Sequence, residues 1–131
     1  MKLSTKGRYG LQAMEILRDC YGQGPIPLNK IATEKGISEA YLEQLFSLLK
    51  KQGLVRSIRG AQGGYELERS PDEINIGEIL RALEGDTMLS CCDDKGEPSC
   101  NESSPCRMKS VLDKIQDSYD EITNSIKLSE M

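Results

Sequence analysis

The chain has 131 residues, no histidine or tryptophan and a formal net charge of -4. A chain of this length forms about one domain, and its low aromatic content of 5% favours a helical core over a β-sandwich. No apolar run reaches the roughly 18 residues of a membrane span, and the N-terminus does not resemble a signal peptide. We therefore expect a cytoplasmic protein of mainly α class, in a reducing compartment where its five cysteines do not form structural disulfides.

The charge is divided unevenly along the chain. Residues 1–69 carry 11 basic and 7 acidic side chains, whereas residues 70–131 carry 6 basic and 14 acidic ones. The first half could therefore meet a polyanion, while the second half should face away from DNA.

The first predicted helix begins near Lys6, behind a cap at Ser4 or Thr5, and stops at residues 21–22. The Gly-Pro-Ile-Pro run at 24–27 forces an extended connection after it. Lys2, Lys6 and Arg8 at the front of this helix are candidate phosphate contacts, or alternatively ordinary surface charges.

A helix-turn-helix follows. A short helix over 28–34 ends at Gly36 as a left-handed cap, and a longer helix starts at the cap residue Ser38 and closes at Gly53. Apolar residues at helical spacing place one face of the second helix in the core. The face left for a major groove includes Ser38, Ala40, Tyr41, Glu43, Gln44 and Ser47. Glu43 either rejects some DNA sequences or is an ordinary solvated residue.

Two short strands, LVRSIR and GYELE, are predicted around the glycine-rich run GAQGG, which can supply the positive φ angles of a hairpin tip. Such a hairpin after a helix-turn-helix forms a wing. Arg56, Arg59 and Gly60 would then lie on a ribbon that can approach phosphates or the minor groove. The alternative is a plain solvated turn.

The chain breaks at residues 70–72, and apolar residues then mark a helix that ends at Gly85. Residues 107–128 are predicted as one long helix without proline or glycine. Its apolar positions repeat at alternating steps of four and three: Met108, Leu112, Ile115, Tyr119, Ile122 and Ile126. This heptad pattern favours a partner chain, so we expect a homodimer, with packing onto the chain's own domain as the alternative.

Four cysteines lie in the polar segment between the last two helices: Cys91, Cys92, Cys100 and Cys106. Paired C-x-x-C knuckles of the kind that bind zinc are absent from the sequence, whereas three spread thiolates can hold an iron-sulfur cluster and leave a fourth position for a weaker ligand. Cys91 is one candidate for that position. The absence of histidine excludes an imidazole ligand from the same subunit.

Three runs of the sequence carry a resemblance to a known family: KLSTKGRYGLQAM, GISEAYLEQLFSLLKKQGLVRSIRGAQGGYELER and IGEILRALEG. They resemble the Rrf2 family of bacterial winged-helix regulators, which includes the IscR, NsrR, RirA and CymR branches. The resemblance implies a homodimer with a winged helix-turn-helix in residues 1–85, a cluster-binding segment in 86–106 and a dimerisation helix with its tail in 107–131. It also implies that Cys92, Cys100 and Cys106 are the metal ligands.

Two departures limit the resemblance. IscR proteins place a histidine three residues after the last cysteine, where this chain has Lys109. The spacing of Cys92, Cys100 and Cys106, with seven and then five residues between them, resembles that of NsrR, RirA and some IscR-like proteins of Gram-positive bacteria. The cluster type therefore stays open, with 2Fe-2S preferred to 4Fe-4S. The CymR branch fits least, because CymR-like members lack the cluster cysteines.

The leading hypothesis is a non-enzymatic repressor that binds double-stranded promoter DNA under the control of an iron-sulfur cluster. It has no membrane or small-molecule substrate as a partner, and it regulates iron-sulfur cluster biogenesis as IscR does. A nitric-oxide or iron-responsive repressor like NsrR or RirA is the alternative within the family. An electron-transfer module or enzyme with an open-site cluster, and a zinc-stabilised adaptor, are the alternatives outside it.

Overall fold

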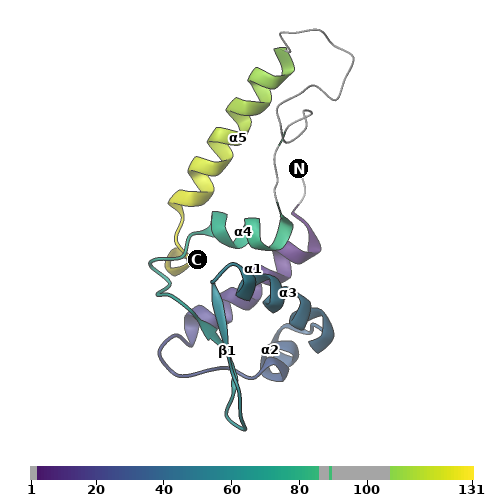
Figure 1. Ribbon diagram of the computed structural model, residues 1–131, viewed down its shortest axis with the longest axis vertical. Coiled ribbons are helices and arrows are strands. Elements are labelled where there is room, and N and C mark those ends of the chain that lie inside the picture. Colours follow the sequence, from purple (N-terminus) through teal and green to yellow (C-terminus); the bar gives the residue numbers. More distant parts are fainter. Residues whose placement is uncertain (1–2, 86–88, 90–106) are drawn as a thin grey trace.

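The structure is a computed structural model, and it describes residues 3–85, 89 and 107–131. Figure 1 shows a winged part, built from the first 85 residues, from which one long helix projects. In chain order the elements are α1 (Thr5–Asp19), α2 (Leu28–Lys35), α3 (Glu39–Lys51), β1 (Val55–Ile58), β2 (Gly64–Leu67), α4 (Ile76–Glu84), α5 (Arg107–Ser125) and the 3-10 turn η1 (Leu128–Glu130). Within these described ranges no helix has the length and apolarity to cross a membrane.

The helix-turn-helix is confirmed, and local chemistry explains its boundaries. The hydroxyl of Ser4 accepts a hydrogen bond from the backbone N–H of Gly7 and so caps α1. Ser38 caps α3 in the same way, and Gly36 ends α2 in the left-handed conformation with φ 66°. The turn between α2 and α3 is therefore built by a glycine and a serine that follow each other closely.

The wing is an antiparallel hairpin in which Val55 pairs with Leu67 and Ile58 with Gly64. It is joined to the chain before α2, because Ile26 and Tyr65 exchange two backbone hydrogen bonds of 2.9 Å. A Cβ at Gly64 would lie 2.1 Å from the carbonyl oxygen of Ile26, so only glycine permits this approach. The start of β2 is thus fixed to the segment that precedes α2.

One hydrophobic core holds the winged part together, with side chains from every helix except α5. Phe46 of α3 is fully buried and stacks on Tyr65 of β2, with 4.5 Å between the ring centroids. Helix α3, the predicted recognition helix, is therefore packed directly against a strand of the wing.

A capping box and an ion pair define the start of α4. Asn75 and Glu78 cap each other's backbone N–H groups, and Arg69 donates to the Glu78 carboxylate over 2.9 Å. Partial burial alone would raise the pKa of Glu78, but the hydrogen bonds from Asn75 and Arg69, together with the charges of Arg69 and Arg81, lower this pKa overall. The ionised carboxylate therefore stabilises the junction between the wing and α4.

The predicted helix over 107–128 is three residues too long, because α5 ends at Ser125. Beyond it the chain extends beside residues 74–76: the N–H of Ile76 donates to the carbonyl of Ile126, and the N–H of Leu128 donates to that of Ile74. Leu128 is completely buried in the core of the winged part. Burial of this side chain and pairing of its backbone explain why the helix stops without a glycine or proline.

Most of the predicted heptad side chains on α5 are exposed. Met108, Ile115 and Ile122 are 58%, 45% and 60% exposed, and Val111, which lies outside the predicted seam, is 56% exposed. Leu112 and Tyr119 are half-buried, and Ile126 lies beyond the end of the helix. The single chain therefore leaves an apolar stripe on α5, formed by Met108, Val111, Ile115 and Ile122.

Candidate nucleic-acid interface

Helix α3 presents one apolar and one polar face. Leu42, Leu45, Phe46 and Leu49 are completely buried and hold the helix on the core. The predicted DNA-facing residues Ser38, Ala40, Glu43, Gln44 and Ser47 are all exposed, and Tyr41 is half-buried. The hydroxyl of Ser38 is already engaged as a helix cap, so its first role is to hold the N-terminus of α3.

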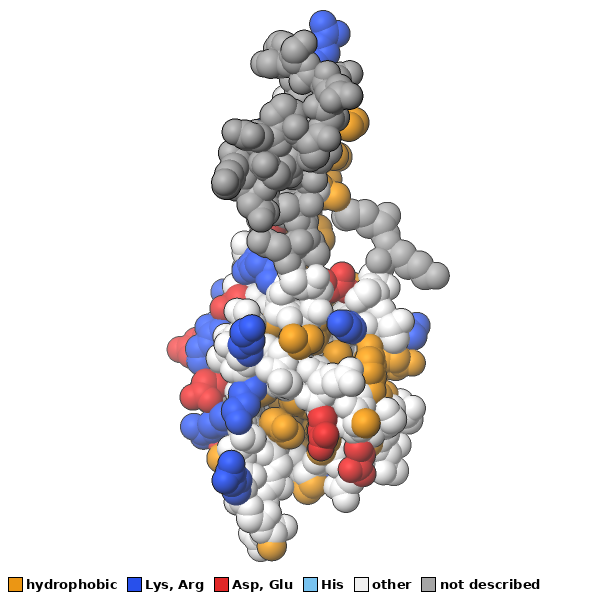
Figure 2. Space-filling model, turned by 45° about the vertical axis from the view of Figure 1, so that its right-hand side comes forward, with side chains coloured by type: hydrophobic (Ala, Val, Ile, Leu, Met, Phe, Trp, Pro, Cys, Tyr) orange, Lys and Arg blue, Asp and Glu red, His pale blue; other side chains and the backbone are white. Residues whose placement is uncertain are grey.

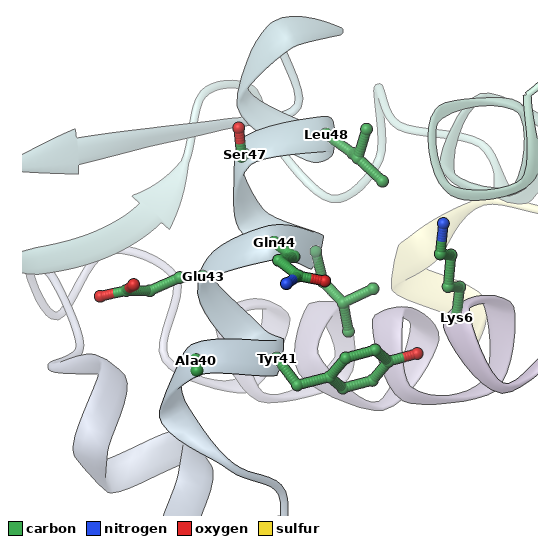
Figure 3. Close-up of a pocket in the computed structure, with 8 residues that line it drawn as sticks. Lys6, Ala40, Tyr41, Glu43, Gln44, Ser47 and Leu48 are labelled. Carbon is green, nitrogen blue, oxygen red and sulfur yellow. The ribbon is translucent and has the colours of Figure 1, made fainter.

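A hollow of about 590 Å³ lies beside this helix and is lined by α3 side chains and by Lys6 of α1. In Figure 3, Tyr41 points from α3 toward α1, while Glu43 points to the opposite side of α3, toward the wing. Gln44 lies between them. The hollow therefore combines one cation and one carboxylate with amide, hydroxyl and phenol groups, beside the apolar side chains of Leu45 and Leu48. The polar groups are donors and acceptors of the kind that contact base edges and phosphates.

An aromatic contact fixes the relative position of α1 and α3. The rings of Tyr9 and Tyr41 meet edge to face, with 6.1 Å between their centroids, and the guanidinium of Arg8 lies 4.9 Å from the centroid of Tyr9. The exposed Arg8 charge is therefore held near the start of the recognition helix. Lys2, predicted beside it, lies outside the described residues.

The two arginines of the wing differ in their surroundings. The Nε and Nη2 atoms of Arg56 each lie 2.6 Å from Oε1 of Glu66, the residue directly opposite on β2. Arg59 is exposed at the start of the wing tip, and none of the ion pairs found in the described part of the chain includes it. The neighbouring Gly60 has a φ of 114°, which satisfies the predicted need for glycine in the tip.

A further contact joins the wing to α3. Nζ of Lys50, near the end of the recognition helix, donates to the hydroxyl of Ser57 on β1 over 2.9 Å. Lys50, Ser57 and Glu66 were not among the predicted site residues. The hairpin register could have found the Arg56–Glu66 pair, because it decides which side chains face each other across the wing. The Lys50–Ser57 contact depends on how α3 packs beside β1, for which the sequence carries no such signal.

The surface of the winged part is mixed rather than uniformly basic. Figure 2 shows Lys and Arg side chains along one side of this part, with acidic side chains among them. Glu39, Glu43 and Glu68 are exposed on α3 and near the wing. Any polyanion that binds here therefore meets cations at defined positions and carboxylates between them.

The predicted metal ligands Cys92, Cys100 and Cys106, and Cys91 beside them, lie outside the described residues. Helix α4 ends before this segment and α5 begins directly after it. The backbone N–H of Leu89 donates to Oε1 of Gln116 over 3.0 Å, which holds the chain beside α5. In the part of the chain that the structure covers, no group of three His, Cys, Asp or Glu side chains could bind a metal.

Comparisons with known proteins agree with this geometry. Residues 3–131 match the model of the Rrf2 family, described as iron-dependent transcriptional regulators. The regulator CymR of Bacillus subtilis is 43% identical over 132 residues, covering 100% of this chain and 89% of CymR. Its solved structure, described as that of the global cysteine regulator, has a TM-score of 0.80 at 41% identity, covering 99% of this chain and 95% of that one.

Proteins named IscR are similar to a comparable degree. IscR of Pectobacterium atrosepticum is 37% identical over 131 residues, covering 100% of this chain and 79% of IscR. The structure of T. potens IscR has a TM-score of 0.80 at 44% identity, covering 100% of this chain and 85% of that one. By overall identity, this chain is therefore about as similar to CymR as to IscR. The cysteine pattern, in contrast, predicts that the chain resembles the CymR branch least.

Proposed function

The chain belongs to the Rrf2 family of DNA-binding transcriptional regulators, and from this premise we propose that it is a homodimeric repressor whose promoter binding depends on an iron-sulfur cluster. The observation that carries the proposal is the pairing of a winged helix-turn-helix with four cysteines between α4 and α5, three of which are the predicted ligands. Such a repressor acts in the cytoplasm, where promoter DNA and reduced thiols coexist.

In this proposal α3 enters the major groove. Ala40, Gln44 and Ser47 recur at helical spacing on the exposed face and contact base edges, with Tyr41 and Glu43 at the sides. The basic groups at the start of α1 and on the wing bind phosphates and set the register of the protein on DNA. Lys2, Lys6 and Arg8 supply the first set; Arg56, Arg59 and the Gly60 backbone supply the second.

The apolar stripe of α5 supports the homodimer. Its four side chains, each at least 45% exposed, follow one side of a 19-residue helix that projects from the winged part. A second copy can cover this stripe with its own α5 and bring two recognition helices onto half-sites about 34 Å apart. The promoter site is then an inverted repeat.

The donor set fits an iron-sulfur cluster, because three thiolates are soft ligands and the segment that carries them contains no competing histidine. Cys92, Cys100 and Cys106 hold the group, with Cys91 as one candidate for the fourth position and 2Fe-2S preferred to 4Fe-4S. When bound, the cluster supplies chemistry that responds to iron supply, oxidants and nitric oxide. Because α4 and α5 flank the segment that would hold the cluster, cluster binding would be coupled to DNA binding through these helices, with a coupling of about 1 to 3 kcal/mol.

The test starts from protein purified without oxygen. We expect a visible charge-transfer spectrum, iron and sulfide in the protein, and binding to an inverted-repeat promoter fragment that falls steeply with salt. Cys92→Ala should remove the spectrum and change promoter affinity about 5- to 150-fold. Cys20→Ala, at the C-cap of α1, is the matched control and should change neither. Promoter binding that is identical in Cys92→Ala and wild type would disprove the sensor.

The similarity to CymR supports a second candidate, a regulator of cysteine supply that needs no cluster. The same spectrum separates the two proposals. Zinc, or no metal at all, together with tight promoter binding favours the second candidate. Iron and sulfide in stoichiometric amounts favour the first.

A further inference from the structure

The wing carries a carboxylate in the position where a DNA-binding surface would be expected to carry only cations. Glu66 lies directly opposite Arg56 in the hairpin register, and one of its oxygens accepts from two nitrogens of the guanidinium at 2.6 Å. The Arg56 side chain is 53% exposed and that of Glu66 is 22% exposed. The cation therefore lies on the outside of the pair, with the carboxylate behind it.

Alternation along the strands places this pair on the outer face of the wing. Val55 and Leu67 are buried, and Ser57 is bonded to Lys50 of α3, so these side chains point toward the winged part. Arg56 and Glu66, one residue away on each strand, point to the other face. The pair is thus available to the phosphate backbone but has no part in packing the wing onto α3.

We infer that Glu66 masks the charge of Arg56 and thereby weakens the sequence-independent part of DNA binding. This inference rests on the proposed function. A guanidinium that already holds a carboxylate releases fewer counterions when it meets a phosphate, because the pair as a whole is neutral. Arg59, which has no such partner on the wing, contributes a full positive charge.

The consequence concerns regulation rather than recognition. Phosphate contacts carry no sequence information, so masking one of them lowers affinity for every DNA sequence by the same factor. A sensor that shifts affinity only about 5- to 150-fold changes promoter occupancy most when the promoter is not already saturated. Glu66 therefore acts through Arg56, as a positioning residue, and keeps DNA affinity low enough for the sensor to change promoter occupancy.

The experiment compares salt dependence of binding to a promoter fragment and to unrelated duplex DNA of the same length. Glu66→Gln keeps the shape of the side chain and removes its charge. We expect it to bind both DNAs about three- to fivefold more tightly at 50 mM salt, and to steepen the slope of log K against log salt by about 0.9. In the Arg56→Gln/Glu66→Gln double variant the slope should return to the wild-type value.

Glu68→Gln is the matched control, because Glu68 is exposed just beyond β2 and forms none of the ion pairs found in the described part of the chain. It should change the slope by less than half as much. Equal slopes for wild type and Glu66→Gln, or weaker binding by Glu66→Gln with an unchanged melting temperature, would overturn the inference while leaving the proposed function intact. Failure of the wild type to bind any duplex DNA in a salt-dependent manner would overturn both.

Discussion

Replacing Leu128 with alanine should destabilise the winged part, although residue 128 lies beyond the last long helix. The side chain has no exposed surface and belongs to the core formed by α1 to α4. Removing a fully buried leucine side chain costs about 3 kcal/mol, from the lost transfer free energy and the cavity left behind. For a domain of this size, that loss lowers the melting temperature by about 10 °C.

Ile126→Ala is a matched control, since both residues lie in the same extended tail and both have backbone groups bonded to residues 74–76. Ile126 is 39% exposed, so its truncation should cost less than about 1 kcal/mol. Urea unfolding of the full chain at two protein concentrations measures the difference and separates it from dimer dissociation. If the two variants lose the same stability within 0.5 kcal/mol, the assignment of Leu128 to the core is wrong.

Three further outcomes are expected. The pKa of Glu78 is lowered in the folded state, so its ionised carboxylate stabilises the fold above the usual carboxyl pKa of about 4.5. This stabilisation is lost as the pH falls through the folded-state pKa. The unfolding free energies of wild type and Glu78→Gln should therefore differ most near neutral pH and converge in acid. Ile115→Asp should turn a dimer into a monomer in sedimentation experiments, whereas Ser110→Asp, away from the apolar stripe, should not. Gln44→Ala should lower discrimination at one base pair by about 1 to 3 kcal/mol without changing the slope of log K against log salt. Lys6→Gln should instead weaken binding to all sequences and reduce that slope by about 0.9. A changed slope in Gln44→Ala together with lost discrimination in Lys6→Gln would refute the proposed docking.

The helix-turn-helix and the wing could be predicted because each boundary is encoded locally. Ser4 and Ser38 accept hydrogen bonds from the first turns that follow them, and Gly36 supplies a left-handed conformation that other residues adopt at a cost. Periodicity then placed the apolar face of α3 in the core. For these elements the tertiary structure agrees with the local preference.

Two features of the structure depended on long-range pairing. The end of α5 at Ser125 is decided by backbone bonds to residues 74–76 and by burial of Leu128, about fifty residues away from its partners in the sequence. The ion pair between Arg56 and Glu66 depends on the hairpin register that brings the two residues opposite each other. Helix propensity and composition carry no information about either contact, so the sequence predicted a longer helix and placed Arg56 on the wing without identifying Glu66 as its partner.

For α3 and the wing, the sequence predicted which residues are exposed but not which side chains contact each other. Helical spacing identified Ala40, Gln44 and Ser47 as exposed, and the structure places them on one face beside Lys6. Spacing could not show that Tyr41 is half-buried against Tyr9, because that contact needs the crossing of α1 and α3. The predicted DNA and metal contacts remain predictions that the experiments above test.

The tail beyond α5 also constrains the order in which the protein can mature on the ribosome. Every residue proposed to touch DNA has been synthesised by residue 60, yet the core behind those residues lacks Leu128 until the long helix has been made as well. A nascent chain that stops earlier leaves the core residues that pack on Leu128 exposed, and is therefore a target for chaperones and proteases. The winged part therefore reaches its full stability only after the cysteines and the long helix have been synthesised.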